Sequence, residues 1–335
     1  AAENLGLSSL EKWDTAFVSE KLKQIQLDLD DQKLKPYFSL ENVKAGVFDI
    51  AGRLYGLSFK KNTTIGVYHT EVDVYEVYNR EGNFYALLYT DFFPRSGKRN
   101  GAWMTSYRGQ KKGQRPHISM VCNFSKPTAS TPSLLTFQEV TTLFHEFGHA
   151  LHGMLANTTY SGLSGTNVFW DFVELPSQLM ENWCYEKEAL KLFAKHYETG
   201  ELLPLEYIDK IKKAGHFQQG SQTLRQLGFG FLDLSYHGKD ATKIEDVKAH
   251  ESQILERVQF LRNYPESCTS TAFSHIFQGG YSAGYYSYKW AEVLDAEAFE
   301  LFLEKGIFDP ETAKSFEENI LSKGGTEHPM ILYKR

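Results

Sequence analysis

The sequence of 335 residues is poor in the features that mark secreted and membrane proteins. Its three cysteines are odd in number and widely spaced, which excludes a disulfide framework and is typical of reduced thiols. No apolar run reaches the length of a membrane span, and no charged start followed by an apolar stretch opens the chain. We therefore expect a cytoplasmic protein without a membrane partner.

An excess of basic charge is also lacking. The chain carries 36 lysines and arginines against 42 acidic residues, so its formal net charge is −6. A nucleic-acid-binding surface needs a basic stripe, and the pairs Lys98–Arg99 and Lys111–Lys112 are instead interpreted as solvated loop charges. We expect no nucleic-acid partner.

Low-complexity tracts, internal repeats and flexible linkers are absent from the sequence as well. With 41% hydrophobic and 23% charged residues, a chain of this length can bury a substantial core. One compact unit that covers residues 1–335 is therefore the simplest expectation.

Most of the chain has the apolar periodicity of amphipathic helices. Glycine, proline and polar turns separate these helical stretches. Helices are expected at residues 11–29, 39–56, 136–153, 174–198, 205–236, 245–261, 282–305 and 310–322.

Residues 64–124 have a different pattern. Val72–Tyr78 alternates between apolar and polar residues, Arg80–Asn83 is a turn, and Phe84–Phe92 returns, which predicts a hairpin. His117–Phe124 adds a strand shortly before the helix at 136–153. The predicted fold is therefore mainly α-helical with a small antiparallel β-sheet next to that helix.

The run His145-Glu146-Phe147-Gly148-His149 lies inside this predicted helix. Residues four apart share a helix face, so His145 and His149 can chelate one metal ion while Glu146 points beside it. Zinc held by three protein ligands keeps a position for water, whose pKa falls to about 7. The carboxylate of Glu146 can take the proton of that water, so the motif predicts a catalytic zinc site.

Two nearby residues do not qualify as the third ligand. The position six residues after His149, where some zinc peptidases carry a histidine, is Leu155. His152 shares a face with both histidines, but its rise of about 10 Å from His145 is too long for one ion. We interpret His152 as a packing or supporting residue.

A second helical segment, Asp171–Trp183, offers carboxylates. Glu174 and Glu181 are seven residues apart and share a face, while Pro176 suits a first helical turn. One glutamate is expected to bind the metal and the other to support a ligand through a hydrogen bond. A solvated acidic face is the alternative interpretation.

A glycine-rich turn, Gly279–Gly280, precedes three tyrosines. The spacing of Tyr281, Tyr285 and Tyr288 predicts three phenols on one helical face. A phenol or a neutral imidazole can donate a hydrogen bond to a developing oxyanion. An aromatic core stripe is the alternative, because the segment continues into an apolar helix.

Together, three segments resemble the thimet oligopeptidase family of zinc metallopeptidases. They are Phe144–His152, Asp171–Trp183 and Phe273–Tyr288, and the resemblance extends over essentially the whole chain. It implies a mainly α-helical zincin of the gluzincin type and one bound zinc ion. It also implies hydrolysis of short peptides, either by internal cleavage as an oligopeptidase or by release of C-terminal dipeptides as a peptidyl-dipeptidase.

The resemblance also implies roles for individual residues. The implied zinc ligands are His145, His149 and Glu174, with Glu146 as the general base. This leaves Glu181 as the supporting residue expected from the spacing. The implied substrate and transition-state contacts are His275, Tyr281 and Tyr288, with Tyr285 as a weaker substrate contact. The loop Leu163–Asn167, which contains Gly165 and Thr166, is similar to the peptide-contacting loop of the family.

In length, the chain departs from the family. Members are typically much longer and carry a largely helical half before the part present here. We therefore expect a monomeric catalytic half whose partners are short peptides and a separate N-terminal half. The alternative is a zinc-containing peptide-binding fragment with little or no activity, because one wall of the substrate channel is missing.

Overall fold

The computed structural model describes residues 5–238, 241–261 and 263–335. These residues divide into two compact units, whereas the sequence pattern indicated a single one. Unit 1 consists of Ala1–Asp30 and Asp209–Trp290, and unit 2 of Asp31–Ile208 and Ala291–Arg335. No described helix is both long and apolar enough to cross a membrane.

Unit 2 combines helices with the sheet. Its helices are α2 (Asp31–Leu34), α3 (Leu40–Tyr55), α4 (Phe137–Leu155), α5 (Trp170–Val173), α6 (Leu175–Glu181), α7 (Lys187–Phe193), α13 (Pro310–Phe316) and α14 (Pro329–Tyr333), together with most of α12 (Ser287–Lys305). Trp183 is fully buried between Phe299 and Phe302, and its indole N–H donates to the carbonyl of Ile307 at 3.1 Å. This aromatic cluster ties the segment after α6 to the end of α12.

The sheet of unit 2 has five strands in the order β1-β2-β3-β5-β4. The strands are β1 (Ser58–Asn62), β2 (Asp73–Tyr78), β3 (Phe84–Asp91), β4 (Trp103–Arg108) and β5 (His117–Val121). The predicted hairpin is confirmed as β2 and β3, which pair antiparallel. The prediction of a purely antiparallel sheet is wrong, because β5 pairs with β3 in parallel. The β4–β5 hairpin joins the sheet through its second strand, so β5 runs in the direction of β3.

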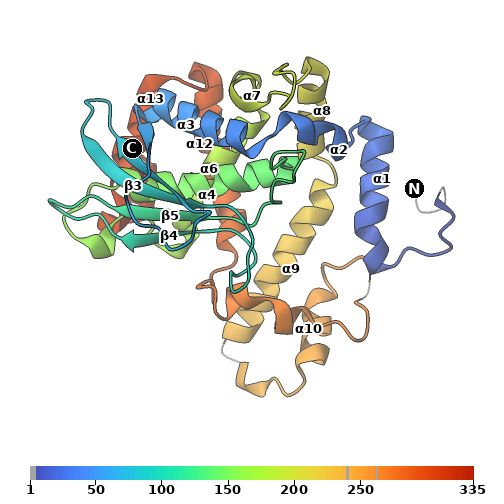
Figure 1. The fold of residues 1–335 in the computed structure, drawn as a ribbon. Helices are drawn as coiled ribbons and strands as arrows, with labels where there is room; N and C mark the ends of the chain where they lie inside the picture. The colour runs from blue at the N-terminus through green and yellow to red at the C-terminus, as the bar shows by residue number, and fades with distance from the viewer. Residues whose placement is uncertain (1–4, 239–240, 262) are drawn as a thin grey trace. The chain divides into compact units, whose positions relative to one another are not determined.

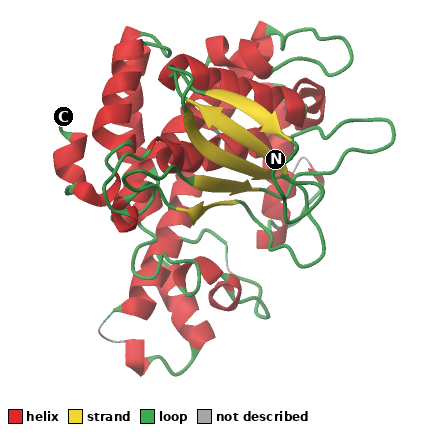
Figure 2. Ribbon diagram, turned by 60° about the vertical axis from the view of Figure 1, so that its left-hand side comes forward, coloured by secondary structure: helices red, strands yellow, loops and turns green. Residues whose placement is uncertain are grey.

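Helix α4 packs against strands β3, β4 and β5 (Figure 1). Figure 2 shows the strands as one twisted sheet with helices packed behind it. The start of α4 is a capping box, in which the Thr136 hydroxyl accepts from the Glu139 N–H at 3.1 Å and the Glu139 carboxylate accepts from the Thr136 N–H at 2.8 Å. Gly153 lets α4 pack closely against the sheet, because a Cβ at this position would lie only 2.7 Å from the side chain of Ile118.

Unit 1 is helical. It contains α1 (Thr15–Leu27), α9 (Gln219–His237), α10 (Val247–Leu255), α11 (Thr269–Ala272) and most of α8 (Leu205–Gly215). The hydroxyl of Ser19 donates to the side chain of Gln218 at 2.9 Å, which links α1 to the start of α9.

Two of the predicted long helices are interrupted. Residues 174–198 form α6, a 3-10 turn at Asn182–Tyr185 and α7, and residues 205–236 form α8 and α9. Gln218 has a φ of +54°, which takes the backbone out of the helical path between α8 and α9. Apolar periodicity continues across such breaks, because both halves of each segment bury the same kind of face.

A buried ion pair joins the ends of β3 and β5. Asp91 is 2% exposed and accepts a bidentate pair of hydrogen bonds from Arg95, at 2.7 and 2.9 Å. Lys98 donates to the same carboxylate at 2.9 Å and to the carbonyl of Cys122 at 2.6 Å. The interpretation of Lys98 as a solvated loop charge is therefore wrong, because its side chain is only 3% exposed. The pair holds the loop after β3 against the segment that leads into α4.

Asp91 should make the stability of unit 2 sensitive to acid. Burial alone would raise the pKa of Asp91, but hydrogen bonds from Arg95 and Lys98 outweigh it and hold that pKa below its usual value. A depressed folded-state pKa stabilises the protein above the unfolded pKa of about 3.9, and that contribution is lost as the pH falls through the folded-state value.

We predict that Asp91→Asn lowers the free energy of unfolding at pH 7 by on the order of 3 kcal/mol, because Lys98 stays buried without its carboxylate. The deficit relative to the unmodified chain should shrink below about pH 4, as Asp91 itself becomes neutral. Denaturant titrations at pH 7 and pH 3 measure both values. Asp49→Asn, which removes an exposed partner of Arg53, is the control and should change little. A pH-independent deficit would contradict the assignment.

Candidate metal centre

The structure brings His145, His149 and Glu174 together in unit 2. Their nearest ligand atoms all lie within 4.8 Å of one another. The Oε2 atom of Glu174 is 3.2 Å from the Nε2 atoms of both histidines. Both histidines come from the middle of α4, and Glu174 is the residue that precedes α6.

Gly148 allows α6 to approach α4 this closely. A Cβ at Gly148 would lie 2.4 Å from the carbonyl oxygen of Pro176 and 2.6 Å from the Cα of Ser177. Any other residue would push the two helices apart, and Glu174 lies at the start of the helix that would move. The glycine inside the motif is therefore a packing requirement of the site.

Two further side chains hold the ligands in place. The Nδ1 atom of His145 donates to Glu181 Oε1 at 2.7 Å, so the supporting glutamate expected from the spacing does contact a candidate ligand. The hydroxyl of Ser177 donates to Glu174 Oε2 at 2.8 Å and to the Glu174 carbonyl at 2.9 Å. Sequence analysis missed Ser177, although its position three residues after Glu174 on a helix was a usable signal.

The charges of the group stabilise one another. Burial alone would lower the pKa of His145, but the carboxylates of Glu174 and Glu181 outweigh it and raise that pKa well above its usual value. Burial alone would raise the pKa of Glu174, which the two histidines hold well below its usual range. Two imidazole nitrogens and a buried carboxylate are a donor set that suits Zn²⁺. They supply the three protein ligands of a catalytic zinc site.

Glu146 lies on the same helix as the two histidines. It is 5% exposed, and its Oε2 atom accepts no hydrogen bond from any described residue. Burial raises its pKa, and the positive charges of His145 and His149 offset only part of that rise. A buried carboxylate with an unused oxygen can accept a proton from a water or a ligand.

His152 lies outside this group. Its side chain is fully buried, and neither ring nitrogen has a hydrogen-bond partner among the described residues. Burial and the nearby His149 lower its pKa to about 3, so His152 is neutral. These properties agree with the packing interpretation.

The predicted tyrosine cluster is located in unit 1. Ring centroids of Tyr281 and Tyr288 are 5.0 Å apart, those of Tyr285 and Tyr288 are 5.1 Å apart, and those of His275 and Tyr281 are 6.2 Å apart. The prediction of one helical face is wrong, because α12 begins only at Ser287 and the tyrosines before it lie on turns. Tyr285 is 8% exposed and its hydroxyl donates to Gln226 at 3.1 Å.

The loop Leu163–Asn167 packs beside α4 in unit 2. Gly165 has a φ of +56°, and a Cβ there would lie 3.0 Å from the Cα of Gly153 on α4. Gly324 lies against the same loop, since a Cβ there would be 2.2 Å from the carbonyl oxygen of Leu163. The loop that contains Gly165 and Thr166 is thus held between α4 and the C-terminal segment by contacts that only glycine permits.

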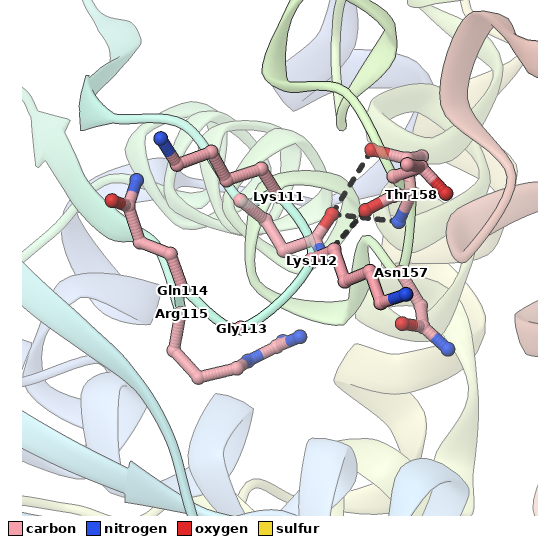
Figure 3. A pocket seen from close by; sticks show the side chains of 9 residues that line it. Lys111, Lys112, Gly113, Gln114, Arg115, Asn157 and Thr158 are labelled. Carbon is pink, nitrogen blue, oxygen red and sulfur yellow. Dashed lines mark hydrogen bonds between the residues drawn. The ribbon is translucent and has the colours of Figure 1, made fainter.

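A cavity of about 430 Å³ lies elsewhere in unit 2, between the β4–β5 turn and the end of α4. Its lining contains none of the predicted site residues and includes Lys111, Lys112, Arg115, Asn157 and Thr158. The two lysine side chains point in different directions (Figure 3), so they do not gather positive charge at one point. The guanidinium of Arg115 donates to the carbonyls of Met154, Ala156 and Tyr85, which satisfies the C-terminus of α4. We interpret the residues around this cavity as structural, because they hold the C-terminus of α4 in place.

Two histidines one helical turn apart and a buried glutamate from a second helix form the donor set of zinc-dependent hydrolases. The whole chain, residues 1–335, matches the sequence profile described as Peptidase family M3. The chain belongs to that family, which confirms the resemblance found in the sequence.

Relatives of this chain include several named peptidases. It is 44% identical to oligopeptidase A of Salmonella typhimurium, over 100% of this chain and 50% of the relative. It is 40% identical to dipeptidyl carboxypeptidase of Escherichia coli, over 98% of this chain and 49% of the relative. It is 33% identical to thimet-like oligopeptidase of Dictyostelium discoideum, over 94% of this chain and 48% of the relative. The chain spans about half the length of the curated relatives it matches.

We predict that His149→Ala and Glu174→Gln each abolish stoichiometric zinc binding, because either change leaves two protein ligands. Glu181→Gln should weaken zinc binding by roughly 10- to 100-fold, since it loosens the orientation of His145. Metal content after dialysis against a chelator series measures all three variants. His152→Leu is the control, and a loss of zinc in that variant would contradict the ligand assignment.

A second prediction concerns Gly148. We expect Gly148→Ala to lower both zinc affinity and thermal stability, because the added methyl group would overlap the backbone of Pro176 and Ser177. Metal titration and thermal unfolding measure the two effects. Gly220→Ala in α9, where a Cβ meets nothing within 4 Å, is the matched control and should be neutral or stabilising. Unchanged zinc affinity in Gly148→Ala would show that α6 does not need this close approach.

Proposed function

We propose that this chain is a zinc-dependent peptidase that hydrolyses peptide bonds in short, unstructured peptides. The main support is the group formed by His145, His149 and Glu174 with the buried Glu146 on the same helix. Membership of Peptidase family M3 and the names of the relatives, which include an oligopeptidase and a dipeptidyl carboxypeptidase, agree with this proposal.

In this proposal the metal ligands are prepared by the chain itself. His145, His149 and Glu174 would hold one zinc ion. When bound, the ion would polarise the peptide carbonyl and lower the pKa of a water molecule. Glu181 accepts a hydrogen bond from Nδ1 of His145 and so orients the ring with Nε2 toward Glu174, where Nε2 can bind the metal once it has lost its proton. Ser177 orients the carboxylate of Glu174 in the same way.

Proton transfer is assigned to Glu146. The unused Oε2 atom of this buried carboxylate accepts a proton from the attacking water and returns it to the leaving amine. A base in this position must be shielded from bulk solvent and must have no competing donor, and Glu146 meets both conditions among the described residues.

Stabilisation of the oxyanion is assigned to Tyr281, Tyr288 and His275. Phenol and imidazole groups donate hydrogen bonds to an oxygen that gains negative charge during attack on an amide. The support for this assignment is the resemblance of Phe273–Tyr288 to the family, and the three rings lie close to one another. We assign peptide contacts to Gly165 and Thr166, because the fixed backbone of a glycine loop can approach an extended peptide closely, and a secondary contact to Tyr285.

We predict that Glu146→Gln lowers kcat by roughly 10²- to 10⁴-fold while zinc content and thermal stability stay unchanged, because only the proton acceptor is lost. The assay is mass spectrometry of the products from a mixture of short peptides with free and amidated C-termini. Glu139→Gln is the control on the same helix, because a glutamine at that position keeps the capping box.

The same assay separates the alternatives. Products confined to dipeptides from free C-termini would identify a peptidyl-dipeptidase, whereas cleavage of amidated peptides would identify internal cleavage. Undiminished activity of Glu146→Gln would refute the proposed mechanism. Zinc content without hydrolysis of any short peptide would support a zinc-containing peptide-binding fragment instead.

A further inference from the structure

Asp233 is a fully buried carboxylate on α9 whose oxygens all face the tyrosine segment or its own helix. Its Oδ1 atom accepts from the backbone N–H of Ala283 at 2.8 Å, and its Oδ2 atom accepts from the backbone N–H of Tyr285 at 2.9 Å. The Nδ1 atom of His237, one turn further along α9, donates to Oδ1 at 2.8 Å. A buried carboxylate needs such donors, and here two of the three belong to the segment that carries the tyrosines.

The backbone at Ala283 is strained. Its φ is +57°, a left-handed conformation that carries an energetic cost for any residue with a Cβ. Gly284 N–H donates to the carbonyl of Tyr281 at 2.8 Å, which makes Ala283 the third residue of a turn where glycine is usual. The hydrogen bond from the N–H of Ala283 to Asp233 offsets this cost and holds the turn closed.

Other contacts hold the first part of the same segment together. The N–H of Tyr281 donates to the carbonyl of His275 at 3.1 Å, and a Cβ at Gly279 would lie 2.7 Å from the Cα of His275. These contacts hold Tyr281 and Gly279 against His275, and neither of them involves α9. The bonds from Ala283 and Tyr285 to Asp233, and the bond from the Tyr285 hydroxyl to Gln226, attach the segment to that helix.

We propose that Asp233 is a positioning residue that holds the turn between Tyr281 and Tyr288 in its reactive geometry. It acts through the backbone of Ala283 and Tyr285, so the two phenols keep their ring separation of 5.0 Å. This inference rests on the proposed function for the kinetic role of the tyrosines, but the attachment of the segment to α9 can be tested without any catalytic measurement.

The kinetic test uses Asp233→Asn, which keeps the shape of the side chain but replaces one acceptor oxygen by an amide group. We expect kcat to fall by roughly 10- to 100-fold, because small misplacements of a group that acts in the transition state are costly. KM should change by less than about twofold, since Tyr281 and Tyr288 act on the transition state in this proposal and the substrate contact of Tyr285 is only a secondary one.

Glu251→Gln is the matched control. Glu251 is another buried carboxylate of unit 1, and it accepts from the N–H groups of Thr269 and Ser270 at 2.9 and 2.7 Å. Its loss should lower the stability of the unit without releasing the tyrosine turn. An equal loss of kcat in Glu251→Gln would overturn the positioning role, because general destabilisation would then explain the effect.

A rescue variant separates positioning from stability. Ala283→Gly added to Asp233→Asn removes the left-handed penalty of the turn. We expect the double variant to recover a measurable part of the lost kcat, about 3- to 10-fold, because about 1 kcal/mol corresponds to a factor of that order. A double variant that is no faster than Asp233→Asn alone would contradict the role of the strained turn.

Hydrogen exchange measures the attachment directly. In the unmodified chain the amides of Ala283 and Tyr285 should exchange slowly, and Asp233→Asn should speed their exchange at least tenfold while Glu251→Gln should not. Glu146→Gln should leave these amides unchanged. If the unmodified chain fails to hydrolyse any peptide, the proposed function fails, and the exchange result alone decides the inference. Equal protection of both amides in the unmodified chain and in Asp233→Asn would overturn it.

Discussion

The close approach of α6 to α4 at Gly148 is the contact on which the metal group depends. Two histidines on one helix supply only two ligands, and the third must come from a separate element. The backbone of Pro176 and Ser177 occupies the space where a side chain at position 148 would be, so Glu174 reaches both imidazoles. Because the two helices are tightly packed, even one added methyl group would move them apart. The geometry of the metal ligands therefore depends directly on this helix contact.

Buried carboxylates recur in both units, and each is stabilised by a different kind of donor. Asp91 accepts from Arg95 and Lys98 and joins the ends of two strands. Glu174 faces two imidazoles and a hydroxyl, which is the environment of a metal ligand. Asp233 accepts mainly from backbone N–H groups and organises a turn. Glu146 alone among these four has a buried oxygen without a donor, which is why it suits a role in proton transfer.

The tyrosine segment shows where periodicity misleads. Spacings of four and three predicted one helical face for Tyr281, Tyr285 and Tyr288, but the residues before Ser287 form turns. The rings nevertheless lie close together, because hydrogen bonds to His275 and Asp233 fold the chain back on itself. The same limit explains the interrupted helices at 174–198 and 205–236, since a periodic pattern records which face is buried and not whether the backbone continues. It also explains the sheet, where the strand at 117–124 was predicted but its parallel pairing with β3 was not.

By itself, the sequence determined the elements whose signals are local. Short-range spacing gives the helix of the motif, the β2–β3 hairpin, the pair His145 and His149, and the two candidate carboxylates Glu174 and Glu181. Tertiary structure decided which glutamate faces both histidines and showed that Ser177 and Gly148 help to build the site. It also showed that His152 is a buried neutral residue and that Lys98 is a buried cation. The physical reason is that burial, close backbone contact and strand pairing join residues far apart in the chain, and local spacing carries no record of those distances.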